Sequence, residues 1–117
     1  MSLWSFFRSS APYKEVSPQE AHERMQRGAV LVDVRESEEL REEGSVPGAV
    51  HNPLSAFDPE RLPRDREAEV LFLCRSGNRS ALVAEAVAQQ LGYQNVYNVR
   101  GGILAWRRAG LPLRNGQ

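Results

Sequence analysis

The only cysteine of the chain, Cys74, stands where an apolar run gives way to a polar segment, CRSGNRS (74–80). A strand that ends at this cysteine must turn tightly before the next helix, and Gly77 can adopt the positive φ that a tight turn requires. Successive backbone N–H groups in such a turn point inward and form an anion-binding nest. The segment therefore predicts a site that holds a negatively charged group beside the cysteine.

The charges around this segment predict a reactive thiolate. The amino terminus of the following helix carries roughly half a positive charge, and Arg75 and Arg79 add their own. We expect these charges to lower the pKa of Cys74 below the value of about 8.5 of a free thiol. Because the thiolate is the nucleophilic form, the pattern indicates covalent catalysis. The alternative, a small buried cysteine in the core, does not account for the polar residues that follow it.

Further residues are candidates for binding or support. Besides the two arginines, the segment offers backbone N–H groups and polar side chains to an anionic substrate through Ser76, Gly77, Asn78 and Ser80. Asp33 and Arg35 follow another apolar run, and we assign them a supporting role. They either orient the loop or Arg79, or form an ordinary structural salt bridge.

The order of the expected elements indicates how these residues are brought together. Strands alternate with helices, which predicts an α/β domain with a mostly parallel sheet. In such sheets ligands bind beyond the carboxyl ends of the strands, and Asp33, Arg35 and Cys74 all lie at those ends. The expected strands are 29–34, 49–51, 69–74 and 95–99, and the expected helices are 18–27 after an N-cap at Ser17, 36–43, a brief one at 59–62, 80–92 and 102–110.

Composition excludes several classes of protein. The chain has 117 residues, of which 41% are hydrophobic and 26% charged, values typical of a single globular domain. The formal net charge is zero, so nothing favours nucleic acid or an anionic membrane as a partner. One cysteine cannot form an internal disulfide, a CxxC redox pair or a thiolate zinc cluster. With only His22 and His51 besides, we expect no metal and no cofactor.

The first residues, 1–13, have a different character from the rest. Leu3, Trp4, Phe6 and Phe7 make this segment an aromatic arm, which we expect to pack on the domain or on a partner rather than to anchor in a membrane. No signal peptide pattern and no apolar stretch of about 20 residues is present. We therefore expect residues 14–117 to form one domain. We also expect the protein to be cytoplasmic and to have no membrane span, and the pattern does not predict an oligomeric state.

Three separated motifs resemble the rhodanese family of sulfurtransferases, specifically its small single-domain members. CRSGNRS resembles the family's active-site loop. DVRE (33–36) followed by GSVPGAVHNPL is similar to its upstream signature, and VRGGILAWRRAGLPL (99–113) to its C-terminal one. The upstream motif departs from the family pattern at Leu40 and Ser45, where an aromatic residue and a histidine are usual. The resemblance implies a mostly parallel five-stranded sheet with helices on both faces.

The resemblance also implies a reaction in two steps. Cys74 takes the outer sulfur of an anionic donor such as thiosulfate and becomes a persulfide. An acceptor nucleophile, a thiol or a protein, then removes that sulfur. Because the chain has no second cysteine, the acceptor must come from outside.

Two other functions remain open on the sequence. A binding or sensory module can retain the fold without turnover, although inactive members of the family often lack the cysteine. Cysteine phosphatases place five residues between cysteine and arginine, whereas four separate Cys74 from Arg79. The shorter loop favours a sulfur atom over a phosphate group.

Overall fold

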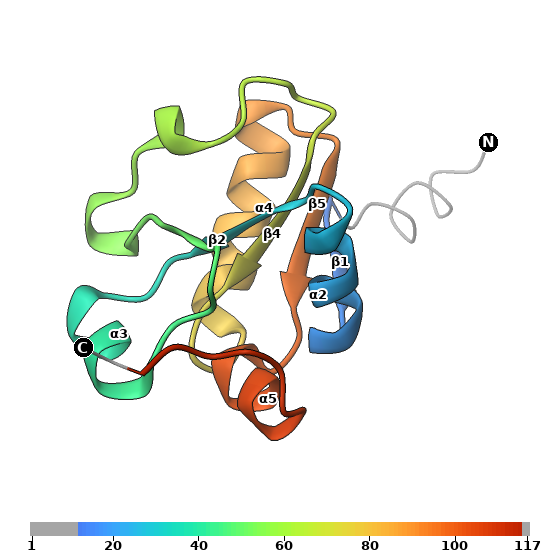
Figure 1. Cartoon of the computed structure of the whole chain (residues 1–117). Coiled ribbons are helices and arrows are strands. Elements are labelled where there is room, and N and C mark those ends of the chain that lie inside the picture. Colours follow the sequence, from blue (N-terminus) through green and yellow to red (C-terminus); the bar gives the residue numbers. More distant parts are fainter. Residues whose placement is uncertain (1–11, 116–117) are drawn as a thin grey trace.

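The computed structural model describes residues 12–115, and its centre is a five-stranded sheet in which all strand pairs are parallel (Figure 1). The strand order is β1-β5-β4-β2-β3, so the strand that precedes Cys74 lies in the middle of the sheet. The strands are β1 (Lys14–Val16), β2 (Val30–Asp33), β3 (Val50–His51), β4 (Glu69–Leu73) and β5 (Asn95–Val99), and the helices are α2 (Pro18–Gln26), α3 (Ser37–Glu43), α4 (Asn78–Leu91) and α5 (Gly102–Arg108), with 3-10 turns η1 (Leu54–Ala56) and η2 (Pro59–Arg61).

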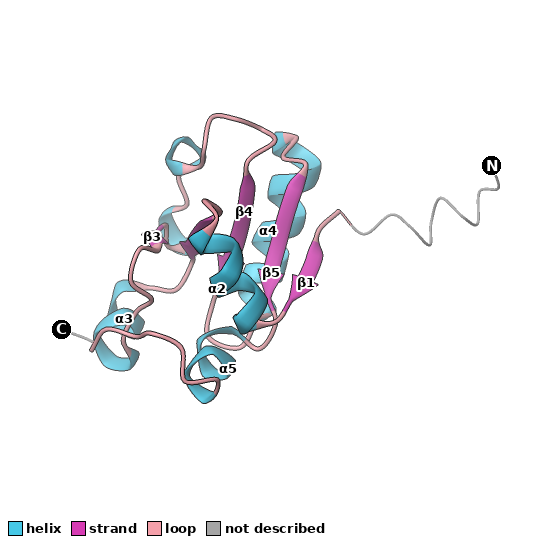
Figure 2. Ribbon diagram, turned by 45° about the vertical axis from the view of Figure 1, so that its right-hand side comes forward, coloured by secondary structure: helices cyan, strands magenta, loops and turns pink. Residues whose placement is uncertain are grey.

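Both faces of the sheet are covered, because strand β4 is apolar on both sides. Val70 and Phe72 belong to the core cluster that includes residues of α4. Leu71 and Leu73 alternate with them and belong to the opposite cluster, with residues of α2 and α5. Figure 2 shows α2 in front of the sheet and α4 behind it. The predicted α/β class, with a parallel sheet and helices on both faces, is confirmed.

The hydrophobic pattern did not predict strand β1. This edge strand has three residues, and only Val16 is buried, so no apolar run marks it. It pairs with β5, from Lys14 opposite Tyr97 to Val16 opposite Val99. Strand β1, which completes the five-stranded sheet, is therefore formed by a segment whose sequence carries no strand signal.

The predicted start of helix α2 is correct, and the predicted start of helix α4 is not. Ser17 caps α2 as expected, since its hydroxyl accepts a hydrogen bond from the Glu20 N–H at 3.1 Å. The expected start of α4 at Ser80 is wrong, because the helix begins at Asn78 directly after Gly77, whose φ is +106°. The turn after Cys74 is thus shorter than predicted, and Arg79 and Ser80 belong to the first turn of the helix.

Leu3 and the aromatic residues Trp4, Phe6 and Phe7 lie outside the described residues, and so does most of the predicted arm 1–13. Over residues 12–115, no helix has the length and apolar character needed to cross a membrane.

Candidate active site

The site is a turn of four residues between the central strand and the longest helix. Strand β4 ends at Leu73, Cys74 follows it, and α4 begins at Asn78. Gly77 is essential to this turn. Its φ is positive, and a Cβ there would lie 3.2 Å from the backbone nitrogen of Gly101, so a side chain would crowd the next loop. The amino terminus of α4 therefore starts directly against the cysteine.

The first turn of α5 holds the other side of the loop. The N–H of Ile103 donates to the carbonyl of Cys74 at 2.9 Å, and the N–H of Leu104 donates to that of Arg75 at 3.2 Å. This approach requires Gly102, because a Cβ there would lie 2.4 Å from the Arg75 carbonyl oxygen. The glycine pair at the start of α5, Gly101 and Gly102, thus serves backbone packing against the loop rather than substrate binding.

The sulfur of Cys74 lies inside the loop and faces hydrogen-bond donors. Cys74 is 1% exposed. The Gly77 N–H lies 3.1 Å from Sγ and the Ser80 hydroxyl 3.3 Å from it. Burial alone raises the pKa of Cys74, but hydrogen bonds from the Ser80 hydroxyl and from the N–H groups of Ser80, Gly77 and Ser76 outweigh it, so the pKa is lowered. The direction of the predicted shift is confirmed.

The two loop arginines are not free positive charges. Arg79 forms two hydrogen bonds with the Glu39 carboxylate, at 2.7 and 2.8 Å, and Arg75 pairs with Glu43 at 2.8 Å. The interaction with Arg79 lowers the pKa of Glu39 to about 2. Each guanidinium is therefore matched by a carboxylate of α3. The hydrogen bonds that lower the pKa of Cys74 come from uncharged donors, the Ser80 hydroxyl and the backbone N–H groups of Ser80, Gly77 and Ser76.

Asp33 and Arg35 form a buried ion pair at 2.7 Å, with side chains 1% and 0% exposed. Arg35 also donates to the Gly44 carbonyl at 2.9 Å, and its Nη1 lies 3.6 Å from Glu43 Oε1. The pair therefore holds the end of α3, where Glu43 in turn contacts Arg75. Among residues 12–115, neither member of the pair has a hydrogen bond or ion pair with Arg79, so the predicted orientation of that arginine falls to Glu39 instead.

Sequence reasoning missed Asn98, although it lies at the centre of the site. It is 2% exposed on β5, and its side chain contacts Ser80, Gly77 and Glu15. A polar residue inside the apolar run NVYNV was the signal that could have found it, because buried amides need partners. The two histidines of the chain make packing and backbone contacts: the rings of His22 and Trp106 form a T-shaped pair, and the ring of His51 contacts the Arg35 carbonyl oxygen.

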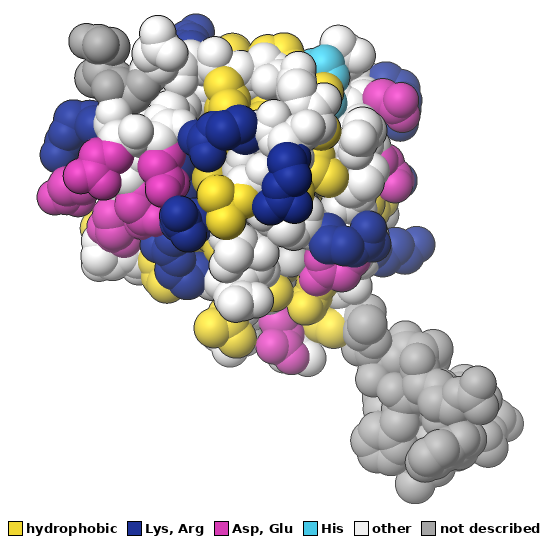
Figure 3. Space-filling view, turned by 90° about the horizontal axis from the view of Figure 1, so that it is seen from below, with side chains coloured by type: hydrophobic (Ala, Val, Ile, Leu, Met, Phe, Trp, Pro, Cys, Tyr) yellow, Lys and Arg dark blue, Asp and Glu magenta, His cyan; other side chains and the backbone are white. Residues whose placement is uncertain are grey.

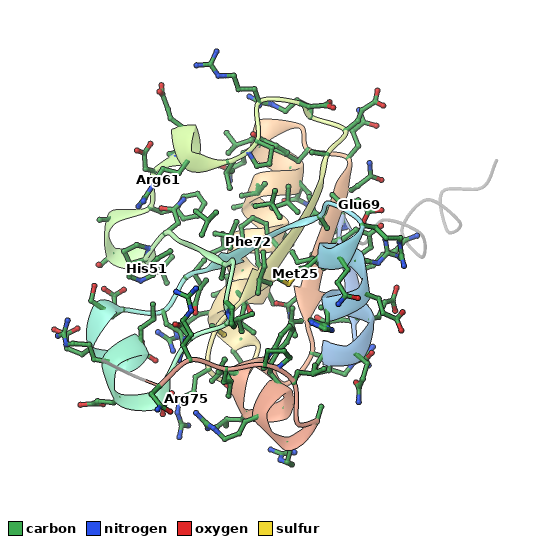
Figure 4. The ribbon with its side chains drawn as sticks, in the orientation of Figure 1. Met25, His51, Arg61, Glu69, Phe72 and Arg75 are labelled. Atoms are coloured by element: carbon green, nitrogen blue, oxygen red, sulfur yellow. The ribbon has the colours of Figure 1, made fainter. Side chains whose placement is uncertain are left out.

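The loop opens on the face at the carboxyl ends of the strands. In Figure 4, Arg75 of the turn lies at this lower end, while Phe72 of the preceding strand β4 lies deep inside. Figure 3 views the molecule from below and shows Lys and Arg side chains over the middle of the face, with a group of Asp and Glu side chains at one edge. The surroundings of the site are thus mixed in charge.

Comparison with known proteins agrees with this arrangement. The family model for the rhodanese-like domain matches residues 17–109. Thiosulfate sulfurtransferase GlpE of Haemophilus influenzae is 39% identical over 103 residues, which cover 87% of this chain and 95% of that protein. A sulfurtransferase of Allochromatium vinosum is 41% identical, over 72% of this chain and 77% of its own length.

A solved structure gives the same answer for the fold. The polysulfide-sulfur transferase homodimer of Wolinella succinogenes has a TM-score of 0.77 and 27% identity, and the match covers 90% of this chain and 80% of that one. The described domain, its three motifs and the cysteine loop at the centre of the sheet are all accounted for by one family. The chain belongs to the rhodanese-like domain family.

Proposed function

We propose that this protein is a sulfurtransferase that carries sulfur as a persulfide on Cys74. The thiolate attacks the outer sulfur of thiosulfate or a related persulfide donor. A new S–S bond forms to Cys74 and the S–S bond of the donor breaks. The electron pair of that bond leaves with sulfite when the donor is thiosulfate, or with a thiolate when the donor is a persulfide. An acceptor thiolate or cyanide then attacks the terminal sulfur, and the electron pair of the enzyme S–S bond returns to Cys74. Neither step needs an oxidant or a cofactor.

The observation that carries this proposal is the position of the sulfur inside a nest of donors. The Gly77 N–H and the Ser80 hydroxyl lie 3.1 and 3.3 Å from Sγ, and the α4 amino terminus points at it. A persulfide is negatively charged at its outer sulfur, so the N–H groups that stabilise the thiolate also suit the intermediate. Ser76, Asn78 and Ser80 line the turn in which that charge would lie.

Arg75 and Arg79, the arginines at the rim of the site, suit a role in attracting an anionic donor. Arg75 is half exposed, with 51% of its side chain accessible, and Arg79 is 35% exposed. Each is paired with a glutamate, so a donor such as thiosulfate would compete with these carboxylates for the guanidinium groups. The supporting pair Asp33–Arg35 acts on the rim only through Glu43.

The acceptor and the setting follow from the single cysteine. Since internal disulfide resolution is impossible, the sulfur must pass to an external thiol or to a protein. We also propose a cytoplasmic location, where a free thiol stays reduced, and no nucleic-acid partner. Residues 14–117 then form the catalytic domain and 1–13 a separate arm.

Intact-protein mass spectrometry after incubation with thiosulfate tests the proposal. We expect the wild type to gain the mass of one sulfur atom, to lose it on addition of cyanide, and Cys74→Ser to gain nothing. Absence of the gain with thiosulfate and with glutathione persulfide, for a protein whose thiol is reduced, would favour the non-catalytic binding module. A phosphatase is disfavoured by the four-residue spacing from Cys74 to Arg79, and hydrolysis of a phosphotyrosine analogue without sulfur uptake would reverse that judgement.

A further inference from the structure

The buried amide of Asn98 has only one orientation that satisfies its neighbours. Its Nδ2 lies 3.1 Å from both carboxylate oxygens of Glu15 and 3.1 Å from the Gly77 carbonyl oxygen. All three of these atoms accept hydrogen bonds, so the NH2 group must face them. Oδ1 therefore faces Ser80, and the amide cannot flip without placing oxygen against oxygen.

The hydroxyl of Ser80 consequently has two acceptors for a single proton. Ser80 Oγ lies 2.6 Å from Asn98 Oδ1 and 3.3 Å from Cys74 Sγ. Because Oδ1 has no proton to give, the short contact requires the Ser80 O–H to donate to it. While that bond is made, Oγ presents lone pairs to the sulfur, and these can accept a hydrogen bond from the thiol S–H but cannot stabilise a thiolate.

We infer that Asn98 is a positioning residue that holds the Ser80 hydroxyl proton away from Cys74 in the thiol form and yields it to the sulfur when Cys74 ionises. The thiol proton leaves to solvent, and the Ser80 proton stays on Oγ throughout; only its direction changes. Asn98 Oδ1 is left without that donor in the thiolate form. Asn98 therefore opposes ionisation and keeps part of the resting enzyme in the thiol form.

The charged side chains around Cys74 are each paired with another group. Arg79 is the cation of α4 nearest the loop, and it is paired with Glu39, while Arg75 is paired with Glu43. After β2 the charges of Asp33 and Arg35 are paired with each other, and from β1 the Glu15 carboxylate accepts from Asn98 itself. Strand β5 and the first turn of α5 bring no charged side chain to the sulfur among the described contacts. Asn98 contacts the loop residues around the sulfur at Ser80 and at the Gly77 carbonyl, and of these two Ser80 is the one whose proton Asn98 can redirect.

The inference rests on the proposed function only in making Cys74 the nucleophile, and it is tested without a sulfur donor. The pKa of Cys74 is measured from the ultraviolet absorbance of the thiolate, with Cys74→Ser as the blank, in the wild type, Asn98→Leu, Ser80→Ala and the double variant. We expect Ser80→Ala to raise the pKa and Asn98→Leu to lower it, each by about one unit, the difference between a charged and a neutral hydrogen bond. In the Ser80→Ala background, Asn98→Leu should have no effect.

Two results would overturn the inference. If Asn98→Leu raises the pKa, or shifts it equally with and without Ser80, then Asn98 acts only by supporting the loop through Gly77. Asn95→Leu is the matched control, because Asn95 lies on the same strand and its amide donates to the Glu67 carbonyl instead. Should Asn98→Leu fail to fold by circular dichroism, Asn98→Ala removes the same acceptor and makes the same comparison. If the four proteins show the expected pKa shifts but Cys74 takes up sulfur from no donor, the proposed function is rejected and this inference stands.

Discussion

The inner and outer halves of the cysteine loop stabilise negative charge in different ways. The inner half surrounds Cys74 with uncharged donors, the Gly77 N–H and the Ser80 hydroxyl, in a buried setting. The outer half contains Arg75 and Arg79, whose charges are already matched by Glu43 and Glu39. The comparison shows that the arginine content of a loop is a poor guide to what activates its cysteine. Dipoles fixed by the fold lie closer to the sulfur and have no counter-ion.

The largest effect should come from disturbing the backbone that shapes the inner half. Gly102→Ala places a Cβ 2.4 Å from the Arg75 carbonyl oxygen at a residue with positive φ. We expect the free energy of unfolding to fall by about 3 kcal/mol or more and sulfur transfer to fall by roughly a hundredfold. Urea denaturation and a thiosulfate–cyanide assay measure both.

Gly110→Ala is the matched control for this change. Gly110 also has a positive φ, +74°, but a Cβ there meets nothing within 4 Å. It should show only the conformational cost, about 1 to 2 kcal/mol, with activity retained. Equal losses of activity in the two variants would mean that the contact with the loop is unimportant.

The next effect should follow removal of the neutral side-chain donor. Ser80→Ala deletes the hydroxyl 3.3 Å from the sulfur, so less thiolate is present near neutral pH. We expect the rate of persulfide formation to fall by about tenfold at pH 7, and the loss to shrink as the pH is raised above the thiol pKa. A loss that is independent of pH would contradict a role in ionisation.

A smaller effect is expected from the outer half, and it should depend on pH. Arg79 lowers the pKa of Glu39 to about 2 from 4.5. The contribution of ionised Glu39 to the free energy of unfolding is therefore fully present above pH 4.5 and is lost as the pH falls towards 2. Glu39→Gln should cost about 1 to 2 kcal/mol at pH 7, since the exposed part of the pair is screened by solvent.

Acid denaturation monitored by circular dichroism measures the contribution of the Glu39–Arg79 pair to the free energy of unfolding. The difference in unfolding free energy between the wild type and Glu39→Gln should narrow steadily below pH 4.5. A difference that stays constant down to pH 2 would show that the charge of Glu39 contributes nothing.

The smallest effect is expected at Arg75. Its side chain is 51% exposed and its partner Glu43 is 23% exposed, and surface pairs of this kind contribute little to stability because solvent screens them. Arg75→Ala should therefore leave the free energy of unfolding nearly unchanged and raise the KM for thiosulfate more than it lowers kcat. Steady-state kinetics with varied thiosulfate separate the two, and a fall in kcat alone would assign Arg75 to the chemistry.

The sequence predicted the parts of this site that depend on local pattern. The apolar runs 29–34 and 69–74 placed Asp33 and Cys74 at neighbouring strand ends, and Ser17 was a sound helix cap. Partners distant along the chain could not be predicted, because no local pattern encodes them. Glu39 is 40 residues from Arg79 and Asn98 is 18 from Ser80. Strand β1 was missed because its pairing with β5 does not require apolar side chains.

The most direct test of the account is the pKa of the Cys74 thiol in the wild type, Ser80→Ala and Arg75→Ala. If uncharged donors hold the thiolate, the wild-type value lies below the value of about 8.5 of a free thiol, and Ser80→Ala raises it by about one unit. Arg75→Ala should then leave it nearly unchanged. A large rise in Arg75→Ala with none in Ser80→Ala would contradict the account and return the activation of Cys74 to the arginines.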